Sequence, residues 1–197
     1  MNAVEQRGRK PRADVQRNRV ALLEAAQRHF LQHGVGTSLE AIASDAGVGP
    51  GTLYRHFPTR EGLLAALLQT RSEELASRQA ACERLDDPAE ALDQWLQAME
   101  EYLSAFNGLP DPLMAVAQAQ DPENPLTVPC SILVTTTEQF LLAAQSGGRV
   151  RLSVRGFDLF LSACSIAWVR SNGADEESLT RLRLLFASGY REQGEKA

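Results

Sequence analysis

The sequence predicts an all-α fold of about nine helices, divided into a small N-terminal helical domain and a larger C-terminal helical domain. Apolar residues recur at helical spacing along most of the chain, and no segment shows the alternation that is typical of a strand. Single Gly residues and the dipeptides Asn-Gly and Asp-Pro divide the chain into segments of helical length. With 197 residues, of which 44% are apolar, the chain is long enough for one large or two small packed units.

The first segment of the chain is basic. Residues 1–13 hold three Arg and one Lys together with Gly8 and Pro11, which predicts a flexible basic arm. Such an arm either reaches into a DNA minor groove or adds only non-specific attraction to phosphate. Asp14 is the expected N-cap of the first helix, which ends near His33 because Gly34 follows it.

The next segment predicts two short helices joined by a tight turn. Thr37 and Glu40 fit a capping box ahead of an apolar helical face. Gly47 is expected to end this helix, because glycine tolerates the left-handed conformation that follows a helix C-cap. Gly49 and Pro50 suit the N-cap and the first position of the second short helix. Two helices with this connection indicate a helix-turn-helix, in which the second helix reads DNA.

The rest of the chain predicts helices alone. A long helix is expected from its cap at Thr59 to about Leu85, connecting the two domains. The sequence Asp-Pro-Ala-Glu then forms a second capping box with Pro in the first helical position. The remaining helices are expected at about 87–106, 112–119, 126–146, 153–171 and 175–192.

The charge distribution agrees with a DNA-binding N-terminal part. The whole chain has a formal net charge of −5, which alone would argue against a DNA-binding protein. Residues 1–60, however, hold nine Lys/Arg and five Asp/Glu, a net +4, whereas residues 61–197 hold eleven and twenty, a net −9. The positive part attracts phosphate, and the acidic part repels DNA elsewhere on the molecule.

Several classes of protein are excluded by what the residues lack. Cys82, Cys130 and Cys164 are far apart in sequence and have no metal-ligand spacing, so we expect no metal, cofactor or disulfide framework. All three histidines lie in the N-terminal part without an accompanying nucleophile, so we expect no enzyme. No apolar run fits a signal peptide or a membrane span, which predicts a cytoplasmic protein without a membrane partner.

Residues 15–68 resemble the tetracycline-repressor (TetR) family of bacterial transcriptional regulators. The resemblance is carried by the pattern IA-x3-GV-x3-TLY-x-HF, followed by T-R-E-x-LL. The sequence departs from the family at Gly49, where Ser is most frequent, and at His29, where the first helix usually has an apolar residue.

The resemblance implies a set of DNA contacts. Tyr54 and His56 would hold phosphates, as would Arg60 at the start of the long helix, while Thr37 or Ser38 would touch the backbone. Arg55 is the candidate for direct base reading, because one guanidinium can bond to both O6 and N7 of guanine. Tyr54 could instead pack partly under the first helix, and others could be ordinary surface residues. The full set is Thr37, Ser38, Pro50, Gly51, Thr52, Tyr54, Arg55, His56 and Arg60.

The resemblance also implies a homodimer formed by the last two helices, which would place two reader helices on a two-fold symmetric operator. Each of these helices carries an apolar stripe, and each stripe could also be intrachain core. The stripes are Phe157, Leu161, Cys164 and Trp168, and Leu179, Leu182, Phe186 and Gly189.

An effector cavity is expected among the helices between these two ends of the chain. Aromatic and Met side chains suit a mostly apolar pocket, although the same residues at helical spacing also form plain core. The candidate lining residues are Trp95, Met99, Tyr102, Phe106, Met114, Thr136 and Phe140.

The predicted organisation is therefore a basic arm at 1–13, a helix-turn-helix domain at 14–60, and a helical effector-binding and dimerisation domain at 61–197. The predicted function is a sequence-specific DNA-binding transcriptional regulator, a repressor released from a palindromic operator when a small molecule binds the C-terminal domain. The alternative is a DNA-binding architectural or protein-recruiting factor, or an activator, without a small-molecule ligand.

Overall fold

The computed structural model describes residues 10–192, with side chains from Ala13 onward. This part of the chain contains ten α-helices and, in place of any β-strand, one isolated bridge between Val150 and Arg191. The all-α prediction is confirmed. The helices are α1 (Lys10–His33), α2 (Leu39–Asp45), α3 (Pro50–His56), α4 (Arg60–Thr70), α5 (Ser72–Cys82), α6 (Pro88–Leu103), α7 (Pro110–Ala119), α8 (Thr127–Ser146), α9 (Gly156–Ser171) and α10 (Glu176–Tyr190).

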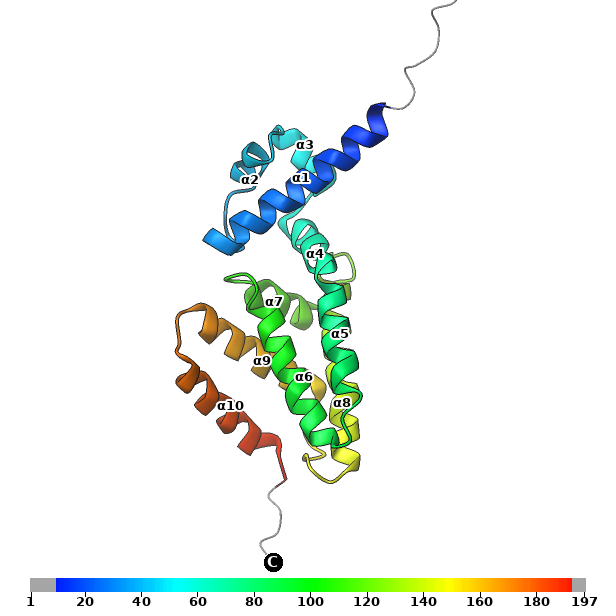
Figure 1. Ribbon diagram of the computed structural model, residues 1–197, viewed down its shortest axis with the longest axis vertical. Coiled ribbons are helices and arrows are strands. Elements are labelled where there is room, and N and C mark those ends of the chain that lie inside the picture. The colour runs from blue at the N-terminus through cyan, green and yellow to red at the C-terminus, as the bar shows by residue number, and fades with distance from the viewer. Residues whose placement is uncertain (1–9, 193–197) are drawn as a thin grey trace, which may run out of the picture.

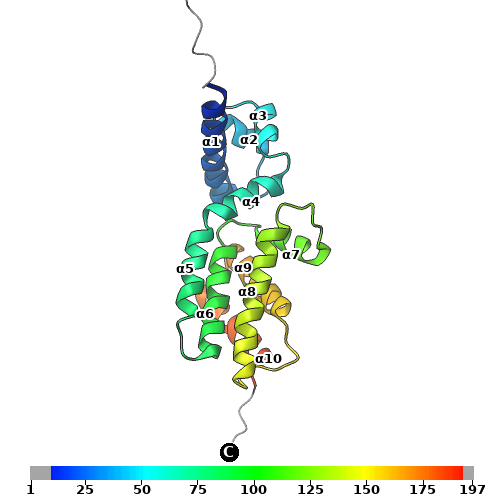
Figure 2. The same ribbon diagram turned by 90° about the vertical axis from the view of Figure 1, so that its right-hand side faces the viewer.

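The molecule is elongated, with α1–α3 at one end and the larger helical bundle at the other (Figure 1). Helices α5, α6 and α8 run side by side along the bundle, and α4 lies across its upper end (Figure 2). The core of the bundle is formed where α6, α8 and α9 meet, and α7 covers one end of α8 and α9. Helix α10 packs mainly on α9, at the edge of the bundle away from α5 (Figure 1).

The first helix begins earlier than expected. Residues 10–13 of the expected basic arm belong to α1, so Asp14 lies inside the helix, where its carboxylate pairs with Arg17 instead of capping the N-terminus. Pro11 is compatible with this start, because a first-turn residue does not need a free N–H. The rest of the expected arm, residues 1–9, lies outside the described residues.

The long helix expected from Thr59 to Leu85 is two helices, which is why the structure has ten helices and not nine. The break lies at Arg71, whose N–H donates to the Leu68 carbonyl three residues earlier and not to the carbonyl four residues earlier. The hydroxyls of Thr70 and Ser72 donate to the carbonyls of Leu67 and Gln69, at 2.7 and 2.8 Å. These side chains satisfy carbonyls that a continuous helix would use, which favours the break.

The other boundaries follow the sequence more closely. Asp87 and Asp175 cap α6 and α10, each accepting a hydrogen bond from a first-turn backbone N–H. Helix α6 ends at Leu103, earlier than the expected Phe106, and a turn follows. Helix α9 begins at Gly156, later than expected at 153, where the carboxylate of Glu138 on α8 accepts the N–H of Gly156. The carboxylate of Asp158 also accepts the N–H of Arg155 at 3.0 Å, so a local cap and a side chain from another helix together set this boundary.

The N-terminal unit is attached to the bundle at a second place besides α4. The Phe30 and Phe106 rings, both almost fully buried, meet edge-on with centroids 5.9 Å apart. Beside them, Gly34 takes a φ of +78°, and a Cβ built on it would lie 2.9 Å from the carbonyl oxygen of Asn107. A glycine is therefore needed where the loop after α1 meets the turn after α6.

Candidate nucleic-acid interface

Helices α2 and α3 form the expected helix-turn-helix. Gly47 has a φ of +70°, as a left-handed residue after α2 requires, and the N–H of Val48 returns to the carbonyl of Ala43. Leu53 and Phe57 bury the inner side of α3 against the core, being 0% and 3% exposed. The opposite side of α3 is therefore the one presented to solvent.

The exposed side of α3 brings together most of the predicted DNA contacts. Pro50, Gly51, Tyr54 and Arg55 are exposed. Thr52 and His56 are half-buried on the same helix. Six of the nine predicted residues thus share a seven-residue helix whose other side is anchored in the core. A short helix held in this way can enter a DNA major groove with its side chains toward the bases.

Arg55 lies on this surface with part of its hydrogen-bonding capacity in use. Its Nε donates to the carbonyl oxygen of Gly51, one helical turn earlier, at 3.1 Å. The bond holds the guanidinium close to its own helix. The two terminal nitrogens are the ones that a bidentate contact to guanine requires.

Ser38 and not Thr37 caps α2. The Oγ atom of Ser38 accepts the N–H of Ala41 at 3.2 Å, so the capping box expected at Thr37 is wrong, and the N-cap lies one residue later. The reason is the backbone: Ser38 has the extended conformation that an N-cap needs, with φ −66° and ψ 130°. Thr37 is half-buried one residue before the cap.

Glu40 connects α2 with α3. Its carboxylate accepts the hydroxyl of Ser38 at 2.7 Å on one oxygen and the hydroxyl of Tyr54 at 2.9 Å on the other. The hydrogen bond from Ser38 is the largest cause that lowers the pKa of Glu40, and the bond to Glu40 raises the pKa of Tyr54. Tyr54 is 42% exposed, and its hydroxyl is bonded to α2.

Arg60 has a role within the domain that the sequence did not indicate. Its Nη1 atom donates to the carbonyl oxygens of Val35 and Thr37, at 2.5 and 2.6 Å. The side chain thereby ties the start of α4 to the loop between α1 and α2. Arg19 of α1 covers the Phe57 ring, with its guanidinium carbon 4.9 Å from the centroid. These two arginines hold the helix-turn-helix against its neighbours.

The residues predicted to line an effector cavity are mostly buried in the core. Trp95 stacks on Phe140 with ring centroids 5.6 Å apart, and its Nε1 donates to Thr137 at 2.9 Å. The hydroxyl of Tyr102 donates to the carbonyl of Leu68 at 3.2 Å. Met99 and Phe106 are almost fully buried, Thr136 is buried, and Met114 is half-buried against the core.

Three hollows of similar size lie around the bundle. The first, about 260 Å³, is bounded by the end of α5, the start of α6 and the C-terminal half of α8, and includes Cys82 and Phe140. The second, about 270 Å³, lies between α7, α8 and the start of α9 and includes Cys130 and Phe157. The third, about 270 Å³, lies between α6, α9 and α10. Of the predicted cavity residues, Phe140 is the one that lines any of these three hollows.

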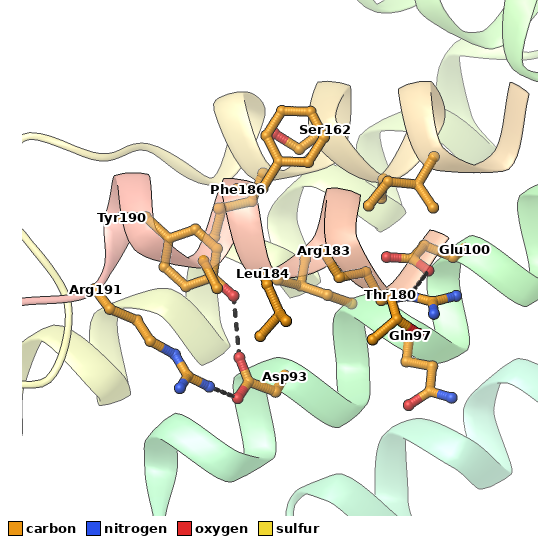
Figure 3. A pocket seen from close by; sticks show the side chains of 15 residues that line it. Asp93, Gln97, Glu100, Ser162, Thr180, Arg183, Leu184, Phe186, Tyr190 and Arg191 are labelled. Atoms are coloured by element: carbon orange, nitrogen blue, oxygen red, sulfur yellow. Dashed lines mark hydrogen bonds and ion pairs between the residues drawn. The ribbon is translucent and has the colours of Figure 1, made fainter. Parts of the chain in front are cut away.

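The third hollow separates α10 from α6, and charged side chains bridge its rim (Figure 3). Nε of Arg183 on α10 lies 2.7 Å from the carboxylate of Glu100 on α6, and Glu100 is 3% exposed. Asp93 on the same helix accepts the Tyr190 hydroxyl at 3.0 Å and pairs with Arg191. Burial raises the pKa of Glu100, while Arg183 opposes that shift. Helix α10 is thus held to α6 by polar contacts.

The two stripes predicted for a dimer interface divide between core and surface. Cys164 and Leu179 are 0% exposed within a single chain, so they are core residues and the prediction is wrong for them. Phe157, Leu161, Leu182 and Phe186 are half-buried, while Trp168 and Gly189 are exposed. Leu184 and Leu185, which the sequence did not single out, are 65% and 66% exposed on α10. The exposed apolar side chains of α9 and α10 are therefore Trp168, Leu184 and Leu185.

No group of three or more His, Cys, Asp and Glu in the described part of the chain is placed to hold a metal ion. The three cysteines are buried and free, and burial raises the pKa of the Cys164 thiol to about 12. Among residues 10–192, none of the helices combines the length and the apolar character needed to cross a membrane.

Two family models match the chain. Residues 22–67 match the model of bacterial regulatory proteins of the TetR family, and residues 87–192 match the C-terminal domain of SbtR-like transcriptional regulators. Two curated relatives are the regulatory protein RaaS of Mycobacterium tuberculosis, 40% identical over 81 residues, and the regulator LmrA of Bacillus subtilis, 34% identical over 119 residues. The matched regions are 41% and 57% of this chain, and 36% and 63% of the two relatives, under two thirds of each relative's length.

Solved structures resemble the chain over most of its length. A TetR transcriptional regulator from Streptomyces coelicolor is 32% identical, with a TM-score of 0.57, over 89% of this chain and 99% of the other. The structure of RolR in complex with resorcinol is 18% identical, with a TM-score of 0.62, over 91% and 90% of the two chains, and shows the shared fold.

Proposed function

The chain belongs to the TetR family of transcriptional regulators, and we propose that it is a repressor released from a two-fold symmetric DNA operator when a small molecule binds its C-terminal half. The observation that carries the DNA-binding part is the α3 surface, where six predicted contact residues stand on a helix anchored by Leu53 and Phe57. On this proposal the protein works in the cytoplasm, without catalysis.

A homodimer is part of the proposal, because one reader helix covers too few base pairs for specific binding. Two copies place two reader helices about 34–36 Å apart, or a multiple of that distance, on one side of the DNA. Trp168, Leu184 and Leu185 are exposed apolar residues on the last two helices, and an interface over them would remove that apolar area from water.

We place the effector in the hollow between α5, α6 and α8. Phe140 lines this hollow and stacks on Trp95, so a ligand there would press on the buried aromatic core. Helix α5 borders the same hollow and leads through Arg71 into α4 and the DNA-binding unit. A ligand that prefers one position of α5 would favour one of two spacings of the reader helices. It can shift the equilibrium between these two states by no more than its differential affinity for them.

The test is fluorescence anisotropy of the full chain on duplexes tiled across the DNA upstream of its own coding sequence, repeated with a panel of small molecules. Resorcinol belongs in the panel because RolR, of the same fold, binds it. We expect salt-dependent binding to one two-fold symmetric duplex and its loss with one class of compound. A scrambled duplex of equal length is the control for sequence choice. Binding of every duplex alike would contradict a sequence-specific regulator.

A matched pair of variants tests the effector site. Phe140→Ala enlarges the proposed hollow, whereas Phe157→Ala acts on the hollow between α7, α8 and α9. Phe140→Ala is expected to leave operator binding in the absence of effector close to that of the wild type. Each variant is compared with its own binding in the absence of effector, because Phe157 also belongs to the predicted dimer stripe. Phe140→Ala should change the concentration of effector needed for release, and Phe157→Ala should not. The reverse result would move the effector to the second hollow.

A further inference from the structure

We infer that Glu40 competes with DNA phosphate for the hydroxyl donors of Ser38 and Tyr54, and thereby limits how tightly the protein holds the DNA backbone of any sequence. The inference rests on the proposed DNA-binding function, since Ser38 and Tyr54 belong to the predicted contact set. Glu40 itself is not among the predicted DNA contacts. The sequence pattern alone explains it as part of a helix cap.

The number of hydrogens on the two hydroxyls carries the argument. A serine or tyrosine hydroxyl has a single hydrogen to donate. Ser38 donates its hydrogen to one oxygen of Glu40 at 2.7 Å, and Tyr54 donates to the other oxygen at 2.9 Å. In this arrangement neither hydroxyl has a hydrogen left to donate to a second acceptor. A phosphate oxygen, which can only accept, gains a bond from either residue when Glu40 releases it.

The charge of Glu40 acts in the same direction. Glu40 is exposed at the N-terminus of α2, on the surface that also carries Tyr54. Its pKa is lowered, first by the bond from Ser38, so the carboxylate is ionised at neutral pH. A carboxylate held at a phosphate-binding surface repels the DNA backbone, and this repulsion is independent of base sequence. Glu40 is thus an acceptor within the protein that occupies the place where a phosphate oxygen of DNA has to bind.

The consequence concerns specificity. Contacts to phosphate position a protein on DNA, and contacts to base edges select the sequence. When the phosphate donors are partly occupied, the affinity for arbitrary DNA falls, and a larger share of operator binding depends on base contacts such as those expected of Arg55. Glu40 would therefore reduce retention on non-operator DNA.

Anisotropy titrations of Glu40→Ala and Glu40→Gln on the operator and on a scrambled duplex test this. Glu40→Ala removes both the charge and the acceptor, and we expect about three- to tenfold tighter binding to both duplexes. Glu40→Gln removes the charge but keeps an acceptor, and should gain less. Glu24→Ala on α1 is the matched control, because it removes one exposed carboxylate of the same unit. Weaker or unchanged binding of Glu40→Ala, or an equal gain in Glu24→Ala, would overturn the inference.

A double-mutant cycle tests whether the gain in DNA affinity depends on the hydroxyl of Tyr54. In a Tyr54→Phe background, Glu40→Ala should gain less than in the wild type, since one of the released donors is absent. An equal gain in both backgrounds would show that Tyr54 has no part in the competition, contrary to the inference. If the wild type binds no duplex, the proposed function fails, and the titration described next still tests the contact itself.

The DNA-independent test is the ionisation of tyrosine, followed by ultraviolet absorbance in the full chain. Glu40 raises the pKa of Tyr54, while burial raises those of Tyr102 and Tyr190 to about 12. Glu40→Ala should lower the pKa of the first tyrosine to titrate and leave the other two unchanged. An unchanged first titration would show that the carboxylate does not hold Tyr54 in solution, and would overturn the inference.

Discussion

The backbone N–H of Val35 donates a hydrogen bond to the carbonyl oxygen of Asn107 at 2.9 Å, joining the loop after α1 to the turn after α6. The DNA-binding unit is therefore attached to the bundle both through α4 and through this contact, which the Phe30–Phe106 pair supports. Two attachments fix the orientation of a rigid unit better than one. A movement of α6 is thus transmitted to α1 directly as well as through the connecting helix.

Gly34→Ala should weaken this second attachment. The new Cβ would lie 2.9 Å from the Asn107 carbonyl oxygen, and the residue would have to keep a φ of +78°. Left-handed backbone at a non-glycine residue costs on the order of 1 kcal/mol, and the clash adds to that cost. We expect a loss of about 2–3 kcal/mol in the free energy of unfolding, measured by urea denaturation.

Gly47→Ala is the matched control for that prediction. Gly47 has a similar φ of +70°, but a Cβ there meets nothing within 4 Å. It should therefore show the backbone cost alone, about 1 kcal/mol. Equal losses in the two variants would mean that the contact with Asn107 contributes nothing to stability.

Arg60→Met should destabilise the N-terminal unit. The variant keeps most of the aliphatic length of the side chain but leaves the carbonyl oxygens of Val35 and Thr37 without their charged donor. Hydrogen bonds to charged groups contribute about 1.5–3 kcal/mol, so a loss in this range is expected on thermal or urea unfolding. Arg55→Met, which removes an exposed arginine of the same unit, should change stability by less than about 0.5 kcal/mol.

Arg55→Ala should relax base preference at one position of each operator half-site by about 1–3 kcal/mol. The measurement is competition anisotropy with operators carrying each of the four base pairs at every position. Arg55→Lys is the informative companion, since an ammonium cannot form the bidentate contact of a guanidinium. If base preference stays the same in Arg55→Ala while affinity falls evenly, Arg55 is a phosphate contact and not a reader.

Arg183→Met should make stability depend on pH. The change leaves Glu100, which is 3% exposed, without its ionic partner, and an unpaired buried charge costs about 3–5 kcal/mol. Burial already raises the pKa of Glu100, and removal of Arg183 raises it further. A carboxyl whose pKa is raised in the folded state binds its proton more tightly there, so stability increases as pH falls through that raised pKa toward the ordinary value of 4.5.

Urea denaturation of Arg183→Met should therefore show its largest loss at neutral pH and a smaller loss in mild acid. The double variant Arg183→Met with Glu100→Gln removes the titrating group and should flatten this pH dependence. A loss that is the same at both pH values in the single variant would show that Glu100 is hydrated in the folded protein.

Leu185→Glu should prevent dimer formation. Leu185 is 66% exposed on α10, and a carboxylate there would be buried in an interface between two copies. Sedimentation velocity should show a monomer that binds the operator far more weakly than the wild type. Ile132→Glu on α8, where the native side chain is 57% exposed, is the matched control and should remain dimeric. Loss of the dimer in Ile132→Glu alone would move the interface to α8.

The sequence predicted the helices well wherever local chemistry defines their ends. Gly34 and Gly47 follow the ends of α1 and α2 as the sequence predicts, and Asp87 and Asp175 cap the expected helices. The break at Arg71 was missed because no Gly or Pro marks it. The hydroxyls of Thr70 and Ser72, which donate back to carbonyls of the preceding turn, are the signal that could have indicated it.

Contacts between elements were beyond the reach of sequence patterns. Glu40 fits a helix cap, and its bond to Tyr54 depends on the packing of α2 against α3. Arg60 looks like a surface arginine until the loop after α1 is placed beside it. Cys164 and Leu179 share helical stripes with surface residues, and spacing alone does not say which side of a helix faces the same chain and which faces a second copy.

The break at Arg71 changes what kind of motion can pass along the chain. A continuous helix transmits rotation about its own axis, because the ladder of backbone hydrogen bonds resists torsion. At Arg71 that ladder is interrupted, and the Tyr102 hydroxyl holds the Leu68 carbonyl beside the break. Twisting of α5 is therefore absorbed at this joint, whereas a sideways displacement of the joint still carries α4 with it.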